Sequence, residues 1–466
     1  MLPSVSSSLL RSNWGSRLSK VWGDSSRSRL GEGGEGGCSS EGEVQDAERK
    51  EQVLQKQDYL LLLAKSLVQY GAPNHRIDLI LSASSKALGI ETSFTMVPGI
   101  MIVVFGNSET HTSETKIMYV FTGMGMAFLE RTNQVAREVR QGWVSTKEGM
   151  RHLESIAEAA EEGYWSLPLM LAGNCMAGFC SCLVSFNGVY LEACIAGGLG
   201  LMCGILSWAS GKLGAFSDIY EFSATVMVSF IAASLHHHVC FEAVVLSSTV
   251  FLLPGTSLTM GLVDTVSQNM LSGAVRMGHA LFTAFVIGFG VNMGDRMWRY
   301  IEGDVEFTEQ VELCSYTSDH WYFVIWVPIN IMTYVIGVQG SAKQVPITMV
   351  VASLGYLSAY LIRHTLGLPM AAPTVAAFVV GLISNVYARL TQELAVVPVV
   401  SSVNFLTPGA VGIRGTWAFL HSDAGKGVTF AEQMFVVALS VATGLFLAGL
   451  VVMPFGKRTR SALMAM

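Results

Sequence analysis

Charged residues are scarce in this chain of 466 residues: Asp, Glu, Lys and Arg together make up 14%, against 51% hydrophobic residues. A soluble domain carries about 25% charged residues, which cover its surface. A chain of this length with so little charge is therefore not a soluble protein throughout. Basic residues number 29 and acidic residues 35, so the positive excess typical of nucleic-acid binding is also missing. We expect no nucleic-acid partner.

The chain also lacks the motifs of several enzyme and metal-binding classes. No G-x-x-x-x-G-K-[ST] loop is present, which argues against a built-in ATP motor. The eight cysteines show no paired C-x-x-C spacing of the kind found in zinc sites. Six of them lie in or beside apolar segments, and we interpret these as small core residues: Cys175, Cys180, Cys182, Cys194, Cys203 and Cys240. We expect no cofactor, no metal site and no catalytic residue.

Hydrophobic residues are concentrated in long runs between about residues 167 and 454. Each run is near the ~20 residues that a helix needs to cross ~30 Å of hydrocarbon with its backbone hydrogen bonds satisfied internally. We predict about ten transmembrane helices, near residues 167–186, 189–208, 220–239, 241–262, 274–294, 321–339, 344–363, 371–388, 393–412 and 432–454. The longest connection, residues 295–320, is strongly acidic and divides them five and five.

The remaining segments complete the predicted domain organisation. Residues 1–50 are rich in Ser, Gly and Arg and are expected to form a disordered tail; the early basic residues Arg11, Arg17 and Lys20 leave an organelle transit peptide as an alternative. Residues 51–165 have no run long enough to span a membrane and are expected to form a soluble α+β domain. The rest divides into a first five-helix repeat (166–298), an acidic connecting loop (299–320), a second five-helix repeat (321–455) and a basic tail (456–466).

Local patterns predict the elements of the α+β domain. A leucine-rich helix, residues 60–70, is expected to end at Gly71, and Asn74 is expected to cap a second helix that ends at Gly89. Strands are predicted at 94–105, interrupted at Pro98-Gly99, and at 116–121, with a turn at residues 106–107. A third helix follows, up to residue 142, and a capping box at residues 145–148 opens a fourth.

An internal repeat points to a mechanism. Residues 245–255 (VLSSTVFLLPG) align with residues 399–409 (VVSSVNFLTPG). Because each half has an odd number of spans, the second copy would enter the bilayer from the opposite side, as in secondary transporters built from inverted repeats. Proline removes a backbone hydrogen bond and glycine weakens a helix, so both spans are predicted to be broken, with free backbone groups facing a cavity. The predicted substrate-binding residues are Pro254, Gly255, Asn404, Pro408 and Gly409. The alternative is that each Pro-Gly pair only kinks a packed helix.

Four carboxylates lie within or beside the predicted spans: Glu192, Glu242, Asp264 and Glu393. A charge at the bilayer centre costs at least ~2.5 kcal/mol, so each is a candidate for proton coupling. Glu242, Asp264 and Glu393 lie near span ends, where they could instead simply reach water at the interface. We expect Glu192 to lie deeper and to be the first proton-carrying candidate.

The histidines give weaker signals. His236, His237 and His238 are consecutive and point to different helix faces, so all three cannot bind one metal ion, and we expect a pH-sensitive cluster at a loop end. His75 and His111 have no Ser or Cys partner at nucleophile spacing, which leaves little support for an enzyme. A small excess of basic residues in loops on one side favours a cytoplasmic N-terminal domain.

The string Tyr70-Gly71-Ala72-Pro73-Asn74-His75-Arg76-Ile77, followed by residues 87–90 (ALGI) and 98–103 (PGIMIV), resembles the opening of the threonine/serine exporter family, which includes fungal pheromone-regulated membrane proteins. Its motif residues here are Gly71, Pro73, His75, Arg76, Pro98 and Gly99. The resemblance covers roughly residues 55–455. It implies export of threonine and serine driven by the proton motive force, with the soluble domain in the cytoplasm.

The predicted fold is thus an all-α polytopic membrane protein with about ten transmembrane helices as two inverted five-helix repeats, preceded by a small α+β soluble domain. The predicted function is secondary active export of small amino acids, coupled to protons, by alternating access between the repeats. The alternatives are a membrane-anchored enzyme that uses the soluble domain, and a non-transporting membrane regulator or scaffold. The expected partners are the amino-acid substrate, protons and the lipid bilayer, in the plasma membrane, the vacuolar membrane or another organelle membrane.

Overall fold

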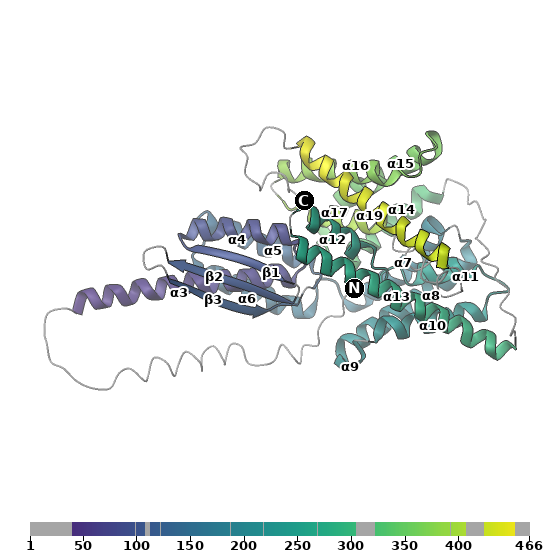
Figure 1. The fold of residues 1–466 in the computed structure, drawn as a ribbon, viewed down its shortest axis with the longest axis horizontal. Helices are drawn as coiled ribbons and strands as arrows, with labels where there is room; N and C mark the ends of the chain where they lie inside the picture. The colour runs from purple at the N-terminus through teal and green to yellow at the C-terminus, as the bar shows by residue number, and fades with distance from the viewer. Residues whose placement is uncertain are drawn as a thin grey trace.

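The computed structural model describes residues 40–97, 99–107, 112–121, 123–186, 188–217, 219–267, 269–303, 322–391, 393–406 and 424–452. It has two parts that lie end to end (Figure 1). One is an N-terminal domain of helices α3–α6 and strands β1–β3, and the other is a bundle of helices α7–α19. Most of the tail predicted for residues 1–50 lies outside the described residues.

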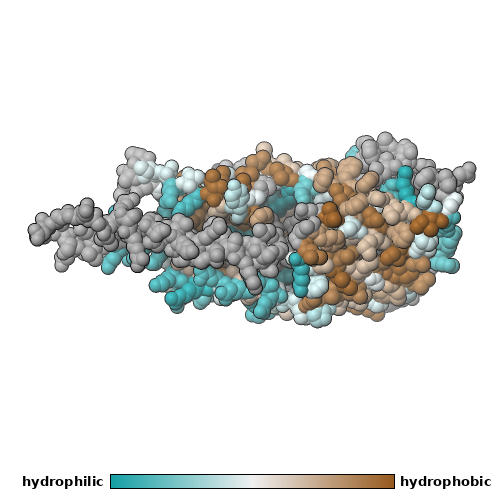
Figure 2. Space-filling view, turned by 90° about the horizontal axis from the view of Figure 1, so that it is seen from below, coloured by the Kyte–Doolittle hydropathy of each residue, from teal (hydrophilic) through white to brown (hydrophobic). Residues whose placement is uncertain are grey.

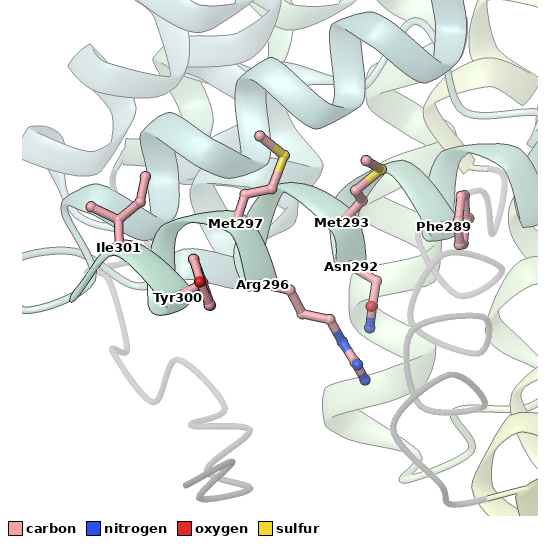
Figure 3. Close-up of a pocket in the computed structure, with 7 residues that line it drawn as sticks. All are labelled: Phe289, Asn292, Met293, Arg296, Met297, Tyr300 and Ile301. Atoms are coloured by element: carbon pink, nitrogen blue, oxygen red, sulfur yellow. The ribbon is translucent and has the colours of Figure 1, made fainter. Parts of the chain in front are cut away.

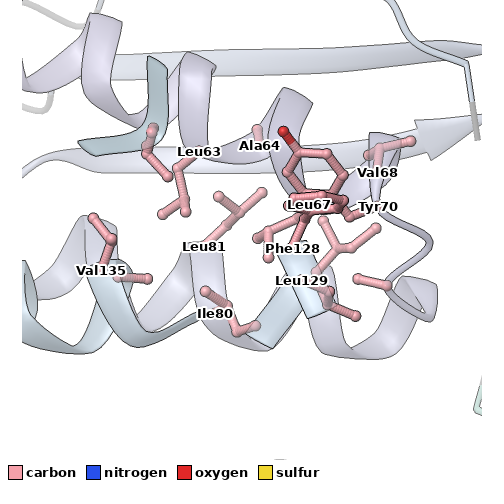
Figure 4. Close-up of a cluster of buried hydrophobic side chains, with 14 of the residues drawn as sticks. Leu63, Ala64, Leu67, Val68, Tyr70, Ile80, Leu81, Phe128, Leu129 and Val135 are labelled. Atoms are coloured by element: carbon pink, nitrogen blue, oxygen red, sulfur yellow. The ribbon is translucent and has the colours of Figure 1, made fainter. Parts of the chain in front are cut away.

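Four helices cover one face of the small sheet in the N-terminal domain: α3 (Ser40–Gln69), α4 (Asn74–Leu88), α5 (Met126–Arg140) and α6 (Thr146–Glu162). The strands are β1 (Glu91–Val97), β2 (Ile100–Asn107) and β3 (Thr112–Tyr119), in antiparallel order β1-β2-β3. Side chains alternate along β2, so that Met101, Val103 and Phe105 are buried against the helices. The core continues through residues such as Leu63, Leu67, Leu81 and Leu129 (Figure 4).

The elements of this domain largely match their sequence signals. Gly71 takes the left-handed conformation (φ 84°) after α3, and Ser145 caps α6 by accepting a hydrogen bond from the Glu148 amide at 3.2 Å. Three details of the prediction are wrong. The α3 helix begins at Ser40, within the expected tail, and β3 begins four positions before residue 116. Asn74 does not cap α4, because its side chain reaches a different partner.

The bundle opens with the long helices α7 (Leu167–Ser185) and α8 (Tyr190–Lys212). The helices that follow in the first half are α9 (Gly214–Ser217), α10 (Tyr220–Ser234), α11 (Phe241–Ser248), α12 (Gly255–Val266) and α13 (Met270–Glu302). Those of the second half are α14 (Tyr322–Gly337), η1 (Ala342–Gln344), α15 (Val345–Thr365), α16 (Ala372–Thr391), α17 (Val396–Leu406) and α19 (Ala424–Val452).

Among the described residues, six helices are long and apolar enough to cross a membrane: α7, α8, α13, η1 with α15, α16 and the part of α19 from Glu432. The other four predicted spans are shorter here: α10, α14 and α17 have 15, 16 and 11 residues, and the span predicted at 241–262 is split into α11 and α12. The surface of the bundle is mostly hydrophobic, whereas the N-terminal domain is mostly hydrophilic on the face in Figure 2. The protein is therefore a multi-pass membrane protein.

The pattern of helix packing is similar within each of the two halves. In the first half α10 packs on α13, and in the second α16 packs on α19. Small residues permit both close approaches, because a Cβ added at Gly294 or Gly444 would collide with a backbone carbonyl oxygen of the facing helix. The halves meet where α7 packs on α14 and α12 packs on α19 and α17.

Candidate functional site

The span predicted to break at Pro254 is broken there. Pro254 precedes α12 with a φ of −81°, and α11 has already ended at Ser248. The first amide of α12 that reaches a backbone acceptor is that of Leu258, which donates to the Pro254 carbonyl at 3.1 Å. Among the described residues, the amides of Gly255, Thr256 and Ser257 therefore have no backbone acceptor. Gly255 is buried, Thr256 is half-buried and Ser257 is exposed, so the positive end of this helix dipole is partly buried.

Helix α17 of the second half contacts the broken span of the first half at this point. The Thr256 hydroxyl hydrogen-bonds the side-chain oxygen of Asn404, near the end of α17. The structure thus brings Pro254, Gly255 and Asn404 together, although 148 positions separate the hydrogen-bonded pair. The last two predicted substrate-binding residues, Pro408 and Gly409, lie outside the described residues. We call this meeting of α12 with α17 the junction.

Aromatic rings surround the junction. The rings of Phe251 and Tyr334 lie 5.6 Å apart between centroids, and those of Tyr334 and Phe405 lie 6.1 Å apart. Phe251 also packs against Gly337, where an added Cβ would lie 2.7 Å from the ring. The rings belong to the α11–α12 turn, α14 and α17, so elements of both halves close the junction together.

The serine pair repeated in the two halves has different surroundings in each. Ser247 and Ser248 of α11 donate to carbonyls one turn back, at 2.5 Å each. The hydroxyls of Ser401 and Ser402 in α17 are buried and have no hydrogen-bond partner among the described residues. The side-chain amide nitrogen of Asn330 in α14 is also buried and has no hydrogen-bond partner among the described residues. Each unpartnered buried polar group costs about 1–3 kcal/mol, which calls for a functional explanation.

Asp264 is the most buried of the four predicted coupling carboxylates, with 1% of its surface exposed. Arg276 Nη1 lies 3.3 Å from its Oδ2, and the Asn74 amide donates to the same oxygen at 3.2 Å. Asn74 also hydrogen-bonds Ser272 of α13. The other carboxylate oxygen, Oδ1, is buried without a partner among the described residues. The alternative that Asp264 simply reaches water at the interface is therefore wrong.

Glu192 does not lie deep in its span as predicted, because it occupies the first turn of α8. Its Oε2 accepts the Val189 amide at 2.8 Å, and its Oε1 accepts the Cys240 amide at 2.7 Å. Both oxygens are thus used to join the start of α8 to the start of α11. Cys240 is disulfide-bonded, which corrects its interpretation as a small core residue.

The remaining two carboxylates lie closer to solvent. Glu393 is half-buried in the connection between α16 and α17 and accepts a hydrogen bond from the Tyr387 hydroxyl at 2.7 Å. Glu242 is half-buried in the first turn of α11. Neither of them contacts the junction in the hydrogen bonds of the described residues.

The motif string at residues 70–77 of the N-terminal domain forms the end that faces the bundle. Gly71 cannot carry a side chain, because a Cβ would lie 2.7 Å from the Gly123 carbonyl oxygen, and Pro73 precedes α4. Burial lowers the pKa of Arg76 to about 10, so its guanidinium stays charged at neutral pH. Gly99 makes the left-handed turn between β1 and β2 (φ 85°). Pro98, His111 and the His75 side chain lie outside the described residues.

The N-terminal domain contacts both halves of the bundle. Asn74 reaches Asp264 in the first half. In the second half, the amides of Met126 and Ala127 donate to the carbonyls of Val338 and Gln339 at 3.2 and 2.9 Å. The apolar core of the domain continues into α17 and the residues before it: Leu394, Val396, Val397 and Val400.

One large surface groove, of about 530 Å³, lies elsewhere (Figure 3). All its lining residues belong to α13: Phe289, Asn292, Met293, Arg296, Met297, Tyr300 and Ile301. A groove lined by one face of a single helix does not enclose a ligand, so the junction is the better candidate site.

Sequence reasoning missed several residues of these sites. Thr256, Ser272 and Arg276 acquire their roles through partners on other helices, which no local pattern identifies. Ser401 and Ser402 carried a usable signal, because the Ser-Ser pair is part of the aligned repeat.

A broken helix and buried polar groups between two halves of similar packing are features found in multi-pass membrane transporters. The sequence profile of ThrE, described as "Putative threonine/serine exporter", matches residues 58–298, and that of ThrE_2, described as "Threonine/Serine exporter, ThrE", matches residues 323–451. The first match alone covers just over half of the chain. The chain belongs to the threonine/serine exporter family.

Among curated proteins, it is similar to three named "Pheromone-regulated membrane protein 10". That of Pichia sorbitophila is 28% identical over 430 residues, covering 87% of this chain and 43% of the relative. Those of Eremothecium gossypii and Saccharomyces cerevisiae are each 27% identical, covering 87% of this chain and 57% and 55% of the relative. The chain thus corresponds to about half the length of these relatives. No solved structure matches it.

Proposed function

We propose that the protein is a secondary active transporter that exports small amino acids of the threonine/serine type, coupled to protons. The observation that carries the proposal is the junction, where uncapped amides of α12 lie opposite Asn404 of the other half. Backbone amides without acceptors and buried hydroxyls without partners are what a small polar solute needs to replace its water shell.

The chemistry of the junction suits an amino-acid zwitterion. A helix N-terminus binds a carboxylate through its amides and its dipole, which assigns the substrate carboxylate to Gly255, Thr256 and Ser257. The side-chain oxygen of Asn404 is an acceptor for the ammonium group. The unpartnered hydroxyl of Ser401, one turn before Asn404 on α17, is available for the hydroxyl of threonine or serine.

Asp264 is our candidate for the proton carrier, in place of Glu192. Both oxygens of Glu192 hold backbone amides, so a proton there would disrupt the starts of two helices. Asp264 has both of its donors on Oδ2 and leaves Oδ1 buried without a partner. A proton on Oδ1 would neutralise the carboxylate without displacing Asn74 or Arg276.

The matched packing of the two halves supports alternating access between inverted repeats. The pairs α10–α13 and α16–α19 would each move as a rigid unit, because glycines allow the two helices of each pair to pack closely. Pro408 and Gly409 would give the second half a break equivalent to the one at Pro254. In this arrangement the aromatic rings of Phe251, Tyr334 and Phe405 are the barrier that the substrate passes.

We further propose that the N-terminal domain is cytoplasmic. The disulfide-bonded Cys240 supports this, because disulfides persist in oxidising compartments. Cys240 directly precedes α11, which lies at the end of the bundle away from the N-terminal domain (Figure 1). Lysines of the N-terminal domain should react with a membrane-impermeant amine label only after intact cells or vesicles have been permeabilised. Labelling of these lysines without permeabilisation would reverse the orientation.

The transport proposal is tested with the full chain in vesicles loaded with labelled threonine. Threonine should leave only while a pH gradient persists. Asn404→Leu should lower the initial rate at least about tenfold, because removing a hydrogen-bonding partner from a half-buried site typically costs about 1–3 kcal/mol. Ser440→Ala is the matched control, since this hydroxyl is exposed and bonds its own helix. The proposal is contradicted if threonine efflux is the same with and without a pH gradient, or if Asn404→Leu leaves the initial efflux rate unchanged.

The substrate assignment has its own test. Valine has the shape of threonine without the hydroxyl, so the unmodified protein should export threonine at least about tenfold faster than valine. Ser401→Ala should narrow this preference and leave the valine rate unchanged. Equal preference in both proteins would show that Ser401 does not read the hydroxyl.

A further inference from the structure

A cluster of metal-binding side chains lies at the far end of the first half. His236 and His237 follow α10, and Glu302 is the last residue of α13. At 1.5 Å per residue, Glu302 is about 45 Å along α13 from Ser272, which contacts the N-terminal domain. The cluster is therefore remote from the junction and from Asp264.

The three side chains converge. One ligand atom from each of His236, His237 and Glu302 lies within 4.8 Å of the others. His237 Nε2 is 3.2 Å from Glu302 Oε1, and His236 Nδ1 is 3.9 Å from Oε2. The two imidazole rings lie 3.8 Å apart between centroids. His238 is not part of the cluster; all three histidines lie in the turn after α10, and the turn directs only the first two towards Glu302.

The surroundings hold these ligands in place. The Ala233 carbonyl lies 2.9 Å from His236 Nδ1, so a proton on Nδ1 donates to this carbonyl, orients the ring and leaves Nε2 to ligate an ion. The loop after the histidines is fixed at Cys240, whose amide donates to Glu192. The C-terminal end of α13 adds the negative end of a helix dipole, which favours a cation.

We propose that His236, His237 and Glu302 form a binding site for a divalent transition metal ion of the zinc class. Two imidazoles and one carboxylate match the preference of such ions for nitrogen with a hard oxygen, and leave a fourth position for water. His237 is 70% exposed, so an ion enters directly from the solution on this side. The bound ion fastens the loop after α10 to the end of α13, in the compartment opposite the N-terminal domain.

The test uses the purified full chain in detergent and Co²⁺ as a spectroscopic probe. One Co²⁺ should bind per chain with the absorption bands of a nitrogen-and-oxygen site, and Zn²⁺ should displace it. His237→Ala and Glu302→Gln should each weaken binding at least about tenfold. His238→Ala is the matched control and should bind as the unmodified protein does.

A second measurement separates ligand loss from misfolding. Zn²⁺ should raise the melting temperature of the unmodified protein and of His238→Ala, but not that of His237→Ala, whereas all three should melt alike without metal. The proposal is overturned if no Co²⁺ bands appear, because the cluster is then only a histidine–carboxylate ion pair. It is equally overturned if His238→Ala loses binding as His237→Ala does.

Discussion

Replacing Asp264 by Asn tests whether this carboxylate carries the proton. Asn keeps the shape of Asp and an oxygen that accepts the Asn74 hydrogen bond, so the contact between the domain and α12 survives. What is lost is the charge on the acceptor. A hydrogen bond to a charged group contributes about 1.5–3 kcal/mol against about 0.5–1.5 for a neutral one, so the variant should be about 1–2 kcal/mol less stable. Arg276 is 25% exposed and can turn to water, which keeps the cost near this range.

Asp264→Leu should cost more, about 3–5 kcal/mol, because it removes the acceptor and leaves Asn74 and Arg276 without their partner. The two variants are compared by thermal unfolding in detergent and by threonine efflux from vesicles. Asp264→Asn should fold, should still exchange threonine across the membrane, and should no longer respond to the pH gradient.

Two results would refute this reasoning. If Asp264→Asn still concentrates threonine with the pH gradient, the carboxylate does not carry the coupling proton. If Asp264→Leu melts at the same temperature as Asp264→Asn, the buried contact with Asn74 and Arg276 does not contribute to stability.

Three further substitutions test the packing. Gly337→Ala places a methyl group 2.7 Å from the Phe251 ring and should cost about 1–3 kcal/mol while slowing efflux, as measured by melting and vesicle assays; unchanged values would contradict the packing at the junction. Gly294→Val should separate α10 from α13 and lower the melting temperature by several degrees, whereas Gly278→Val on the open side of α13 should be tolerated; equal effects would reject the close helix contact. Ser145→Ala removes the cap of α6 and should cost about 1 kcal/mol in thermal unfolding, with efflux unaffected; no loss of stability would mean that the cap is not formed.

The sequence predicted what depends on local or periodic patterns. Run length identified the long helices, the Pro-Gly pair at residue 254 located the break, and the Ser145 capping box placed the start of α6. Each of these signals acts within a few residues, so no knowledge of tertiary contacts is needed to read it. The same holds for Gly71, whose left-handed conformation follows from its place after a helix.

What the sequence could not provide are contacts between distant segments. Asn74 is the first residue of α4 and its side chain bonds Asp264, 190 positions away, so the expectation that it caps the helix is wrong. Glu192 was ranked first because it lies in an apolar run, but its place in the first turn depends on where α8 begins. The convergence of Glu302 with two histidines depends on α13 being long enough to reach the end of α10.

The two attachments of the N-terminal domain to the bundle differ in kind. Main-chain amides and a continuous apolar core bind it to the second half. In the first half, the Asn74 side chain donates hydrogen bonds to the Asp264 carboxylate and to the Ser272 hydroxyl. The domain is therefore joined to the second half by main-chain bonds and apolar packing, whereas its polar contact with the first half depends on the Asn74 side chain. A movement of α12 away from the N-terminal domain would have to break this hydrogen bond, whose strength depends on the charge of the Asp264 carboxylate.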